Sequence, residues 1–397
     1  MEFKNFKGIS LSPLGFGAMR MPTLPDGSID QVKLDEMVDY AIAQGINYFD
    51  TAAPYHSGLS EGAISRSLKR HPKEKWFLAD KYPGHQIVSH YDPAAVFEDQ
   101  LKKCGLDCFD FYLLHNVNDK SVETYLDPKW GIIDYFVEQK KQGRIKHLGF
   151  SCHSRPEGLK DFLDAVGEHM EFCQIQLNYL DWTLQDAKAK YELLTERGIP
   201  VWVMEPVRGG KLSKMPEELE AQLKAMRPDE SISSWGFRFL RGLDNVTMVL
   251  SGMSNLEQMM DNVKTFSTGG TLEKCEKEVL FAVAEKLKDA VPCTACRYCC
   301  DGCPVGLDIP LIISNDNDAR LGWGINNAIY MSAIAPDKRP AACINCGQCS
   351  SVCPQQIDVP AIMADFAALY ERSSKWEDIC REREEAALRE KAARKAK

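Results

Sequence analysis

Eight short apolar segments, separated by amphipathic stretches, span residues 14 to about 290 of this 397-residue chain. Each segment has the length of a buried β-strand, and the apolar residues between them have the spacing of surface helices. The expected strands cover residues 14–17, 46–49, 76–79, 109–114, 145–150, 172–177, 201–204 and 246–250. This alternation restricts the chain to α/β folds with a mainly parallel sheet.

Glycine residues mark the ends of several expected helices, since glycine favours the left-handed conformation at a helix C-terminus. The stretches 34–44, 94–103, 132–141 and 187–197 end near Gly45, Gly105, Gly143 and Gly198. Eight strand–helix units in roughly 270 residues predict a (β/α)8 TIM barrel. The rival is an open doubly wound sheet, but Gly15 and Gly17 lack the third glycine of its phosphate-binding turn.

The cysteines are unevenly distributed and predict a second domain. Of 15 cysteines, nine lie between residues 293 and 353. We expect a barrel domain over residues 1–290, a small domain over 291–365 and a charged C-terminal helix over 366–397. Because residues 375–397 contain few apolar side chains, we expect that last helix to be solvated and to fray.

Two copies of the spacing Cys-x2-Cys-x2-Cys-x3-Cys-Pro fill the second region. In such runs three closely spaced thiolates bind one iron–sulfur cluster and the fourth cysteine binds the other. The first expected [4Fe–4S] cluster takes Cys293, Cys296, Cys299 and Cys353, and the second takes Cys343, Cys346, Cys349 and Cys303. The alternative is zinc, which uses well-separated Cys pairs. We expect a domain similar to bacterial two-cluster ferredoxins, with Cys300 as a spare thiol.

The charge balance limits the partners of the chain. It has 48 Lys and Arg against 57 Asp and Glu, a net charge of −9, which argues against nucleic acid or an anionic membrane as the main partner. No apolar run is long enough to span a bilayer, and the N-terminus lacks the apolar core of a secretory signal. We expect a cytoplasmic protein without a membrane span.

Four residues of complementary chemistry follow three neighbouring expected strands, at the end where barrels place their active sites. Asp50 and Tyr55 follow the second strand, Lys81 follows the third, and His115 ends the fourth. An ammonium group lowers the pKa of a neighbouring phenol, a carboxylate fixes the ammonium, and a histidine can orient a carbonyl oxygen. Each residue alone has a structural explanation, such as packing or capping. Together they predict a proton-transfer site.

These residues carry a resemblance to a known family. The motif D-T-A-x-x-Y at residues 50–55, Lys81, the L-L-H at 113–115 and the opening at 12–17 resemble the aldo–keto reductase family. With its cysteine-rich tail, the chain is similar to ferredoxin-fused members of that family in bacteria and archaea. The resemblance implies hydride transfer between a nicotinamide and a carbonyl or alcohol substrate. It implies Tyr55 as proton donor, Lys81 and Asp50 as its tuning pair, and His115 as substrate orienter.

The resemblance also implies where NADP or NAD binds. Ser151 and Gln174 match residues that hold the carboxamide, and Met204 stands where the family often has an aromatic residue. Arg208 and Lys211 are two cations near the expected pyrophosphate path. The remaining expected cofactor contacts are Pro206, Val207, Gly210, Gly252, Ser254, Gln258 and Asn262. Residues 251–258 lack a basic pair for a 2′-phosphate, so the choice between NAD and NADP stays open.

The loops do not identify the small-molecule carbonyl or alcohol substrate. In the loop 82–92, His85, His90 and Tyr91 are expected either to line the substrate pocket or to pack at the surface. The same two alternatives hold for Trp130 and Trp182.

Three functions are compatible with these features. In the first, which we favour, an oxidoreductase transfers hydride while two clusters relay electrons to or from a redox partner protein; the presence of all four strand-end residues argues against the third. In the second, an NAD(P)H-dependent carbonyl reductase uses its clusters only to stabilise the fold. In the third, the chain is a redox-sensing or electron-carrier subunit on a barrel scaffold and is not an enzyme.

Overall fold

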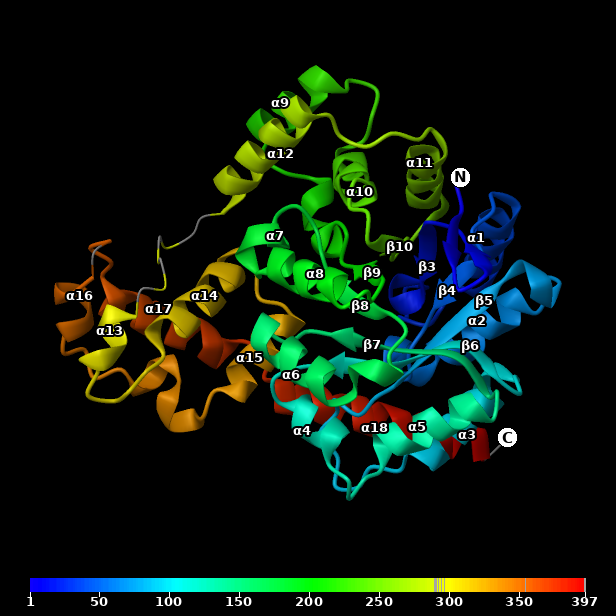
Figure 1. The fold of residues 1–397 in the computed structure, drawn as a ribbon, viewed down its shortest axis with the longest axis horizontal. Helices are drawn as coiled ribbons and strands as arrows, with labels where there is room; N and C mark the ends of the chain where they lie inside the picture. The colour runs from blue at the N-terminus through cyan, green and yellow to red at the C-terminus, as the bar shows by residue number, and fades with distance from the viewer. Residues whose placement is uncertain (289–290, 292, 294, 296, 354, 396–397) are drawn as a thin grey trace. The chain divides into compact units, whose positions relative to one another are not determined.

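The structure is a computed structural model that describes residues 1–397 except 289–290, 292, 294, 296, 354 and 396–397. It divides into two compact units (Figure 1). The first comprises residues 1–283 together with 383–397, and the second comprises residues 284–382. Compact units do not by themselves define domains, so the expected domain limits at 290 and 365 stay predictions.

A closed barrel of eight parallel strands forms the first unit, in the order β10-β3-β4-β5-β6-β7-β8-β9. The strands are β3 (Leu14–Gly17), β4 (Tyr48–Asp50), β5 (Phe77–Tyr82), β6 (Phe109–Val117), β7 (Ile145–Cys152), β8 (Cys173–Gln176), β9 (Val201–Met204) and β10 (Val246–Ser251). All eight overlap the apolar segments identified in the sequence. The predicted (β/α)8 barrel is therefore confirmed, and the open-sheet alternative is excluded by closure between β10 and β3.

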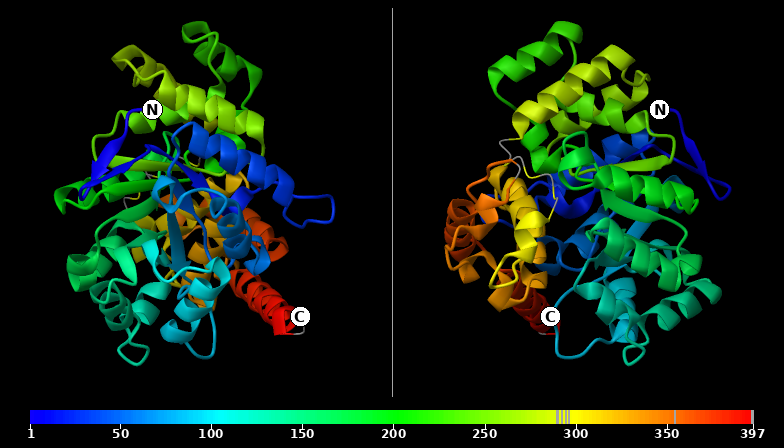
Figure 2. Two further views of the ribbon diagram at one scale, coloured as in Figure 1. Left: turned by 90° about the vertical axis from the view of Figure 1, so that its right-hand side faces the viewer. Right: turned by 60° about the vertical axis from the view of Figure 1, so that its left-hand side comes forward.

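Helices surround the barrel (Figure 2). They are α1 (Gln31–Ala43), α2 (Ser60–Leu68), α3 (Pro93–Cys104), α4 (Ser121–Leu126), α5 (Ile132–Lys141), α6 (Pro156–Val166), α7 (Asp181–Leu184), α8 (Ala187–Glu196), α9 (Glu217–Met226), α10 (Ile232–Arg241), α11 (Leu256–Ser267) and α12 (Lys274–Leu287). The glycines expected to end α1, α3, α5 and α8 have positive φ angles between 58° and 87°. Their conformation explains why glycine stands at these positions.

A two-stranded hairpin, β1 (Lys4–Phe6) and β2 (Ile9–Leu11), closes the N-terminal end of the barrel. Phe6 packs with its ring centroid 4.9 Å from that of Trp202, inside a cluster that also contains Tyr48, Phe111 and Phe172. No pattern in the sequence predicts this hairpin. These side chains fill the barrel at the amino ends of the strands. Any ligand therefore has to enter at the carboxyl ends.

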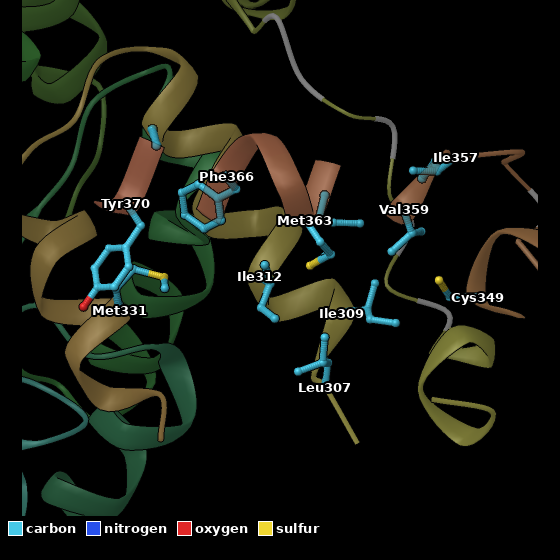
Figure 3. Close-up of a cluster of buried hydrophobic side chains, with 12 residues drawn as sticks. Leu307, Ile309, Ile312, Met331, Cys349, Ile357, Val359, Met363, Phe366 and Tyr370 are labelled. Carbon is cyan, nitrogen blue, oxygen red and sulfur yellow. The ribbon is translucent and has the colours of Figure 1, made fainter. Parts of the chain in front are cut away.

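The second unit is helical and repeats one pattern twice. A short helix and a longer one, α13 (Tyr298–Asp301) and α14 (Ile309–Arg320), correspond to α16 (Gln348–Ser351) and α17 (Val359–Arg372), with α15 (Ile325–Ala333) between the pairs. Asp308 and Asp358 cap α14 and α17 by accepting backbone N–H bonds. Leu307, Ile312, Met363 and Phe366 form the core of the unit (Figure 3).

The last helix, α18 (Trp376–Lys395), was expected to be solvated. Its residues from Arg383 onward instead belong to the barrel unit, and Arg383, Ala386 and Glu390 are half-buried. No helix in the described part of the chain combines the length and apolar character needed to cross a membrane.

Gly149 in β7 offers a test of barrel packing. A Cβ atom there would lie 2.6 Å from the carbonyl oxygen of Phe172 and 2.6 Å from its ring. We expect Gly149→Ala to lower the free energy of unfolding by about 1–3 kcal/mol, because Phe172 directly precedes β8 and its backbone cannot move without displacing that strand. Gly62→Ala in α2 is the control, since its nearest neighbour is the flexible Arg66 side chain at 3.4 Å. Urea unfolding measures both, and equal stability of the two variants would contradict this account.

Candidate active site and candidate metal centre

The barrel brings together Asp50, Lys81 and His115, from the ends of β4, β5 and β6. The Lys81 ammonium donates hydrogen bonds to Asp50 Oδ1 at 2.5 Å and to the Thr51 carbonyl oxygen at 2.7 Å. The side chains of Lys81 and Asp50 are 0% and 3% exposed. A buried ion pair with this geometry has little freedom to rotate, so the positive charge has a fixed position beneath the barrel mouth.

Tyr55 begins a tight turn, η2 (Tyr55–Gly58), in which His56 and Ser57 adopt positive φ angles of 49° and 55°. This turn directs the phenol ring over the ion pair. The ring centroid lies 5.0 Å from Lys81 Nζ, and the His115 ring meets it edge-on at 5.8 Å between centroids. All four strand-end residues predicted from the sequence therefore lie together.

The electrostatics of Tyr55 differ from the prediction. Burial raises the pKa of Tyr55 above its usual value, and the charge of Lys81 opposes this shift without reversing it. The predicted net lowering of the pKa is therefore wrong. The raised pKa is compatible with proton donation, because the phenol is protonated at neutral pH and can donate that proton.

His115 is a neutral imidazole. Burial lowers its pKa well below the usual value, and the neighbouring His85 and Lys81 lower it further. Its backbone carbonyl accepts hydrogen bonds from the Tyr125 hydroxyl at 2.5 Å and from His85 Nδ1 at 3.0 Å. Its own Nδ1 has no hydrogen-bond partner among the described residues.

Of the loop residues whose role the sequence left open, His85 lies at the site. Its ring centroid is 4.5 Å from that of His115, and burial lowers its pKa to about 3. His90 and Tyr91 instead pack on Trp130, with ring centroids 5.4 Å and 5.1 Å away.

The residues expected at the carboxamide lie on adjacent strands. Ser151 and Gln174 are direct neighbours in the register of β7 and β8. Ser151 Oγ accepts a hydrogen bond from the Asn116 backbone N–H at 2.7 Å. The buried Gln174 Oε1 has no hydrogen-bond partner among the described residues, so it can accept one from an amide ligand. Met204 is half-buried at the end of β9.

The turn after β9 leads into η5 (Arg208–Ser213), where Gly209 and Gly210 have φ angles of 65° and 95°. Pro206 is buried, Val207 is half-buried, and Lys211 is exposed. Arg208 differs from the expectation of a second cation for the cofactor. It is buried with Nε 3.1 Å from Asp181 Oδ1, so its charge is balanced inside the protein.

Arg20 is a further cation near the expected cofactor contacts, and the sequence did not predict it. It lies 3.7 Å from Glu205, and Cβ atoms on Gly209 and Gly252 would each lie 3.0 Å from its side chain. Arg20 thus joins the ends of β3, β9 and β10. No sequence pattern marks it, since it follows its strand as a single charged residue.

The expected contacts after β10 form an ordered loop. The Ser254 backbone N–H donates to Gln258 Oε1 at 2.8 Å, and Asn255 caps α11. Asn262 donates to Ser251 Oγ at 3.0 Å. These bonds fix the loop that contains Gly252, while its role in cofactor binding stays a prediction.

In the second unit, one cavity is lined by all four cysteines assigned to the second cluster. They are Cys303, Cys343, Cys346 and Cys349. Among the described residues no three His, Cys, Asp or Glu side chains are placed to hold a single metal ion. A [4Fe–4S] cluster has a different requirement, because each of its iron atoms takes its own thiolate. The donor set around this cavity fits such a cluster.

The first cluster site is described only in part. Cys293, Cys299, Cys300 and Cys353 pack against the apolar core of the unit. Cys296 lies outside the described residues, so this ligand set stays a prediction.

Comparisons with known proteins agree with the fold and the site. Residues 13–276 match the aldo/keto reductase family, and the chain belongs to that family. Residues 292–358 match a 4Fe-4S dicluster domain. The resemblance found in the sequence is thus confirmed, and the chain is a nicotinamide-dependent oxidoreductase with an iron–sulfur region.

Relatives of known name share about a quarter of their residues with the chain. An uncharacterized oxidoreductase, YqkF, of Bacillus subtilis is 26% identical over 289 residues, covering 64% of this chain and 87% of that protein. The NADH-specific methylglyoxal reductase of Escherichia coli is 25% identical over 228 residues, covering 52% and 66%. The structure of the aldo-keto reductase AKR11C1 from Bacillus halodurans in its holo form superposes with a TM-score of 0.59, at 26% identity, covering 71% and 96%.

The buried histidines make the barrel sensitive to acid. The pKa of His85 is about 3 when folded, below the usual value near 6.5, so the unfolded chain binds more protons as the pH falls below about 6.5. We expect this group to lower the free energy of unfolding by about 2 kcal/mol at pH 5 relative to pH 7.5. His85→Asn keeps a donor for the His115 carbonyl and cannot titrate. Urea unfolding at both pH values should show a smaller decline in this variant, and an unchanged decline would refute the assignment.

Proposed function

We propose that the chain transfers hydride between a nicotinamide and a small carbonyl or alcohol substrate at the mouth of the barrel. The observation that carries this proposal is the Tyr55 ring held over the buried Lys81–Asp50 pair, with neutral His115 at its edge. Proton transfer to a carbonyl oxygen requires a proton donor, a charge that stabilises the donor's anion, and a group that orients the oxygen.

In the direction of reduction, a bound nicotinamide supplies the hydride to the carbonyl carbon. The Tyr55 hydroxyl gives its proton to the carbonyl oxygen, and the Lys81 ammonium stabilises the phenolate that remains. Asp50 holds the ammonium in place. The neutral His115 ring orients the carbonyl oxygen by a hydrogen bond before the proton moves.

Ser151 and Gln174 are suited to hold the carboxamide, since they offer a hydroxyl group and a buried amide oxygen on adjacent strands. Met204 covers one face of the ring. The turn with Pro206, Val207, Gly210 and Lys211 and the loop with Gly252, Ser254, Gln258 and Asn262 are proposed to hold the rest of the dinucleotide. Arg20 adds a cation between these two segments. We propose NAD or NADP as ligand, and titration with both distinguishes them.

We further propose that two [4Fe–4S] clusters relay electrons between the nicotinamide site and a redox partner protein. In the direction of alcohol oxidation, the hydride that a bound nicotinamide would take up carries two electrons. Passing them on, one to each cluster, would release a proton and the oxidised nicotinamide, so two clusters match one turnover. A structural role is the alternative, and one observation favours it. Cys349 is a member of the apolar core of the second unit, and the assigned ligands Cys293, Cys299, Cys303, Cys343 and Cys353 pack against that core. A cytoplasmic location stays a prediction.

Removing the proton donor tests the enzymatic function. Tyr55→Phe is expected to lower kcat for aldehyde reduction by about a hundredfold or more, because positioned general acids contribute factors of about 10² to 10⁴. Tyr40→Phe on α1 is the matched control and is expected to retain wild-type turnover. If kcat of Tyr55→Phe stays within twofold of the wild-type value, the chain is not a reductase of this type. That result would favour the non-enzymatic alternative.

Iron content and turnover test the clusters. After anaerobic reconstitution we expect about eight iron atoms per chain. Cys349→Ala is expected to lose about four of them, while Cys300→Ala loses none. Addition of NADH or NADPH should bleach cluster absorbance near about 420 nm if the clusters relay electrons. Full aldehyde turnover in Cys349→Ala, without bleaching in the wild type, would leave only the structural role.

A further inference from the structure

Lys81, which carries the positive charge of the candidate site, is held by side chains at its backbone as well as at its ammonium group. Gln100 Nε2, on α3, donates a hydrogen bond to the Lys81 carbonyl oxygen at 3.0 Å. The Lys81 backbone N–H donates to Asp80 Oδ1 at 2.8 Å. Both side chains are buried. The position of Lys81 therefore depends in part on a helix residue that lies outside the barrel strands.

Two further contacts fix the orientation of the Gln100 amide. Its Nε2 atom also donates to Glu61 Oε1 at 3.0 Å, and its Oε1 atom accepts a hydrogen bond from the Tyr112 hydroxyl. A flipped amide would place its oxygen against two other acceptor oxygens, those of Glu61 and Lys81. Gln100 therefore has one favoured orientation, in which its NH2 group faces the Lys81 carbonyl.

Glu61 connects this network to the segment that carries the proton donor. It lies in the first turn of α2, which starts at Ser60, shortly after the turn η2 that begins with Tyr55. The start of α2 is also tied to the end of β4, because Ser60 Oγ lies 2.8 Å from Thr51 Oγ1. Hydrogen bonds from Glu61 through Gln100 to Lys81 thus join the helix that follows Tyr55 to the strand that carries the ammonium.

The buried charge of this network is balanced. Lys103 Nζ lies 2.9 Å from Glu61 Oε2 and offsets the carboxylate. Burial and the negative charge of Glu61 raise the pKa of Asp80 well above its usual value, which favours the neutral form of Asp80. One carboxylate and one ammonium then balance each other, and the carboxylate is a strong hydrogen-bond acceptor for Gln100.

We propose that Gln100 and Glu61 are positioning residues for Lys81, which hold its ammonium at the distance from the Tyr55 ring at which it stabilises the phenolate. The inference rests on the proposed function and adds two residues to it. Gln100 contacts Lys81 at the carbonyl oxygen, so it acts through the backbone of the lysine. A role limited to satisfying buried polar groups would predict no specific effect on proton transfer.

Replacing the amide tests this role in the full-length, reconstituted enzyme. Gln100→Met keeps a similar side-chain size and removes the donor for the Lys81 carbonyl. We expect kcat for aldehyde reduction to fall about tenfold to a hundredfold, because a displacement of about 1 Å at a catalytic group has effects of this size. KM for the aldehyde should change by less than about twofold, since the lost interaction acts in the transition state.

Gln139→Met on α5 is the matched control. Gln139 is also a buried glutamine, and its Oε1 atom accepts a hydrogen bond from Arg144 at 2.8 Å. This variant should keep the wild-type kcat. An equal loss of kcat in Gln139→Met and Gln100→Met would overturn the proposal, as would an unchanged kcat in Gln100→Met.

A pair of variants at Glu61 decides the question even if Gln100→Met does not fold. Glu61→Gln keeps an acceptor oxygen for Gln100, while Lys103 keeps Asp99 at 3.3 Å as a partner, so most of kcat should be retained. Glu61→Met removes the acceptor and should lower kcat about tenfold. Equal kcat in the two variants would contradict the positioning role.

A double-mutant cycle separates positioning from a general loss of stability. In a Lys81→Met background no ammonium is left to position, so Gln100→Met should lower kcat further by less than about twofold. A further loss as large as the loss in the wild-type background would mean that Gln100 does not act through Lys81, and the proposal would fail.

Crystal structures of the wild type and Gln100→Met separate this inference from the proposed reaction, because they require no turnover. We expect Lys81 Nζ to move by about 1 Å relative to the Tyr55 ring. If it moves although the wild type reduces no aldehyde, the proposed reaction fails and the positioning role stands. If its position is unchanged, the positioning role fails whatever the activity.

Discussion

The ion pair between Lys81 and Asp50 is the interaction on which the candidate site depends. Removing two charges from water costs several kcal/mol for each ion, and the structure offsets this cost with a 2.5 Å hydrogen bond and a second bond to the Thr51 carbonyl. Neither partner can be lost alone without leaving an uncompensated buried charge. The pair therefore has one geometry, and that geometry places a positive charge 5.0 Å from the centre of the Tyr55 ring. A phenol that is protonated at rest and stabilised as an anion during reaction is what proton donation requires.

Closure of the barrel explains how residues far apart in sequence reach one site. The four strand-end residues Asp50, Tyr55, Lys81 and His115 span residues 50 to 115, and the expected cofactor residues extend to 262. Eight parallel strands bring their carboxyl ends to one rim, while the hairpin β1–β2 and the aromatic cluster around Trp202 fill the other end. Residues Arg383–Lys397, most of which lie in α18, also belong to the barrel unit, although they follow the second unit in sequence.

Much of the fold and the four strand-end residues could be predicted from the sequence, because buried strands and the polar residues that follow them form local patterns along the chain. The eight strands were found within a few residues of their observed limits. The net pKa shift of Tyr55 was predicted with the wrong sign, since a sequence shows that a lysine is near but does not show how deeply the phenol is buried. Arg208 was expected near the pyrophosphate path of the cofactor. Its position in the sequence does not show that it pairs with Asp181. Arg20 depends on tertiary packing alone, and no spacing marks it. His85 could be named from its loop, but only tertiary packing shows that it lies beside His115.

Reduction of an aldehyde with a reduced nicotinamide that carries deuterium at both hydrogen positions of C4 tests the central claim most directly. The site has a proton donor and an oxygen-orienting group, so the hydrogen that reaches carbon has to come from the cofactor. We predict that the product alcohol carries deuterium at the former carbonyl carbon, as mass spectrometry would show. A product without deuterium, formed while the cofactor is oxidised, would mean that electrons reach the substrate by another route and would contradict the account.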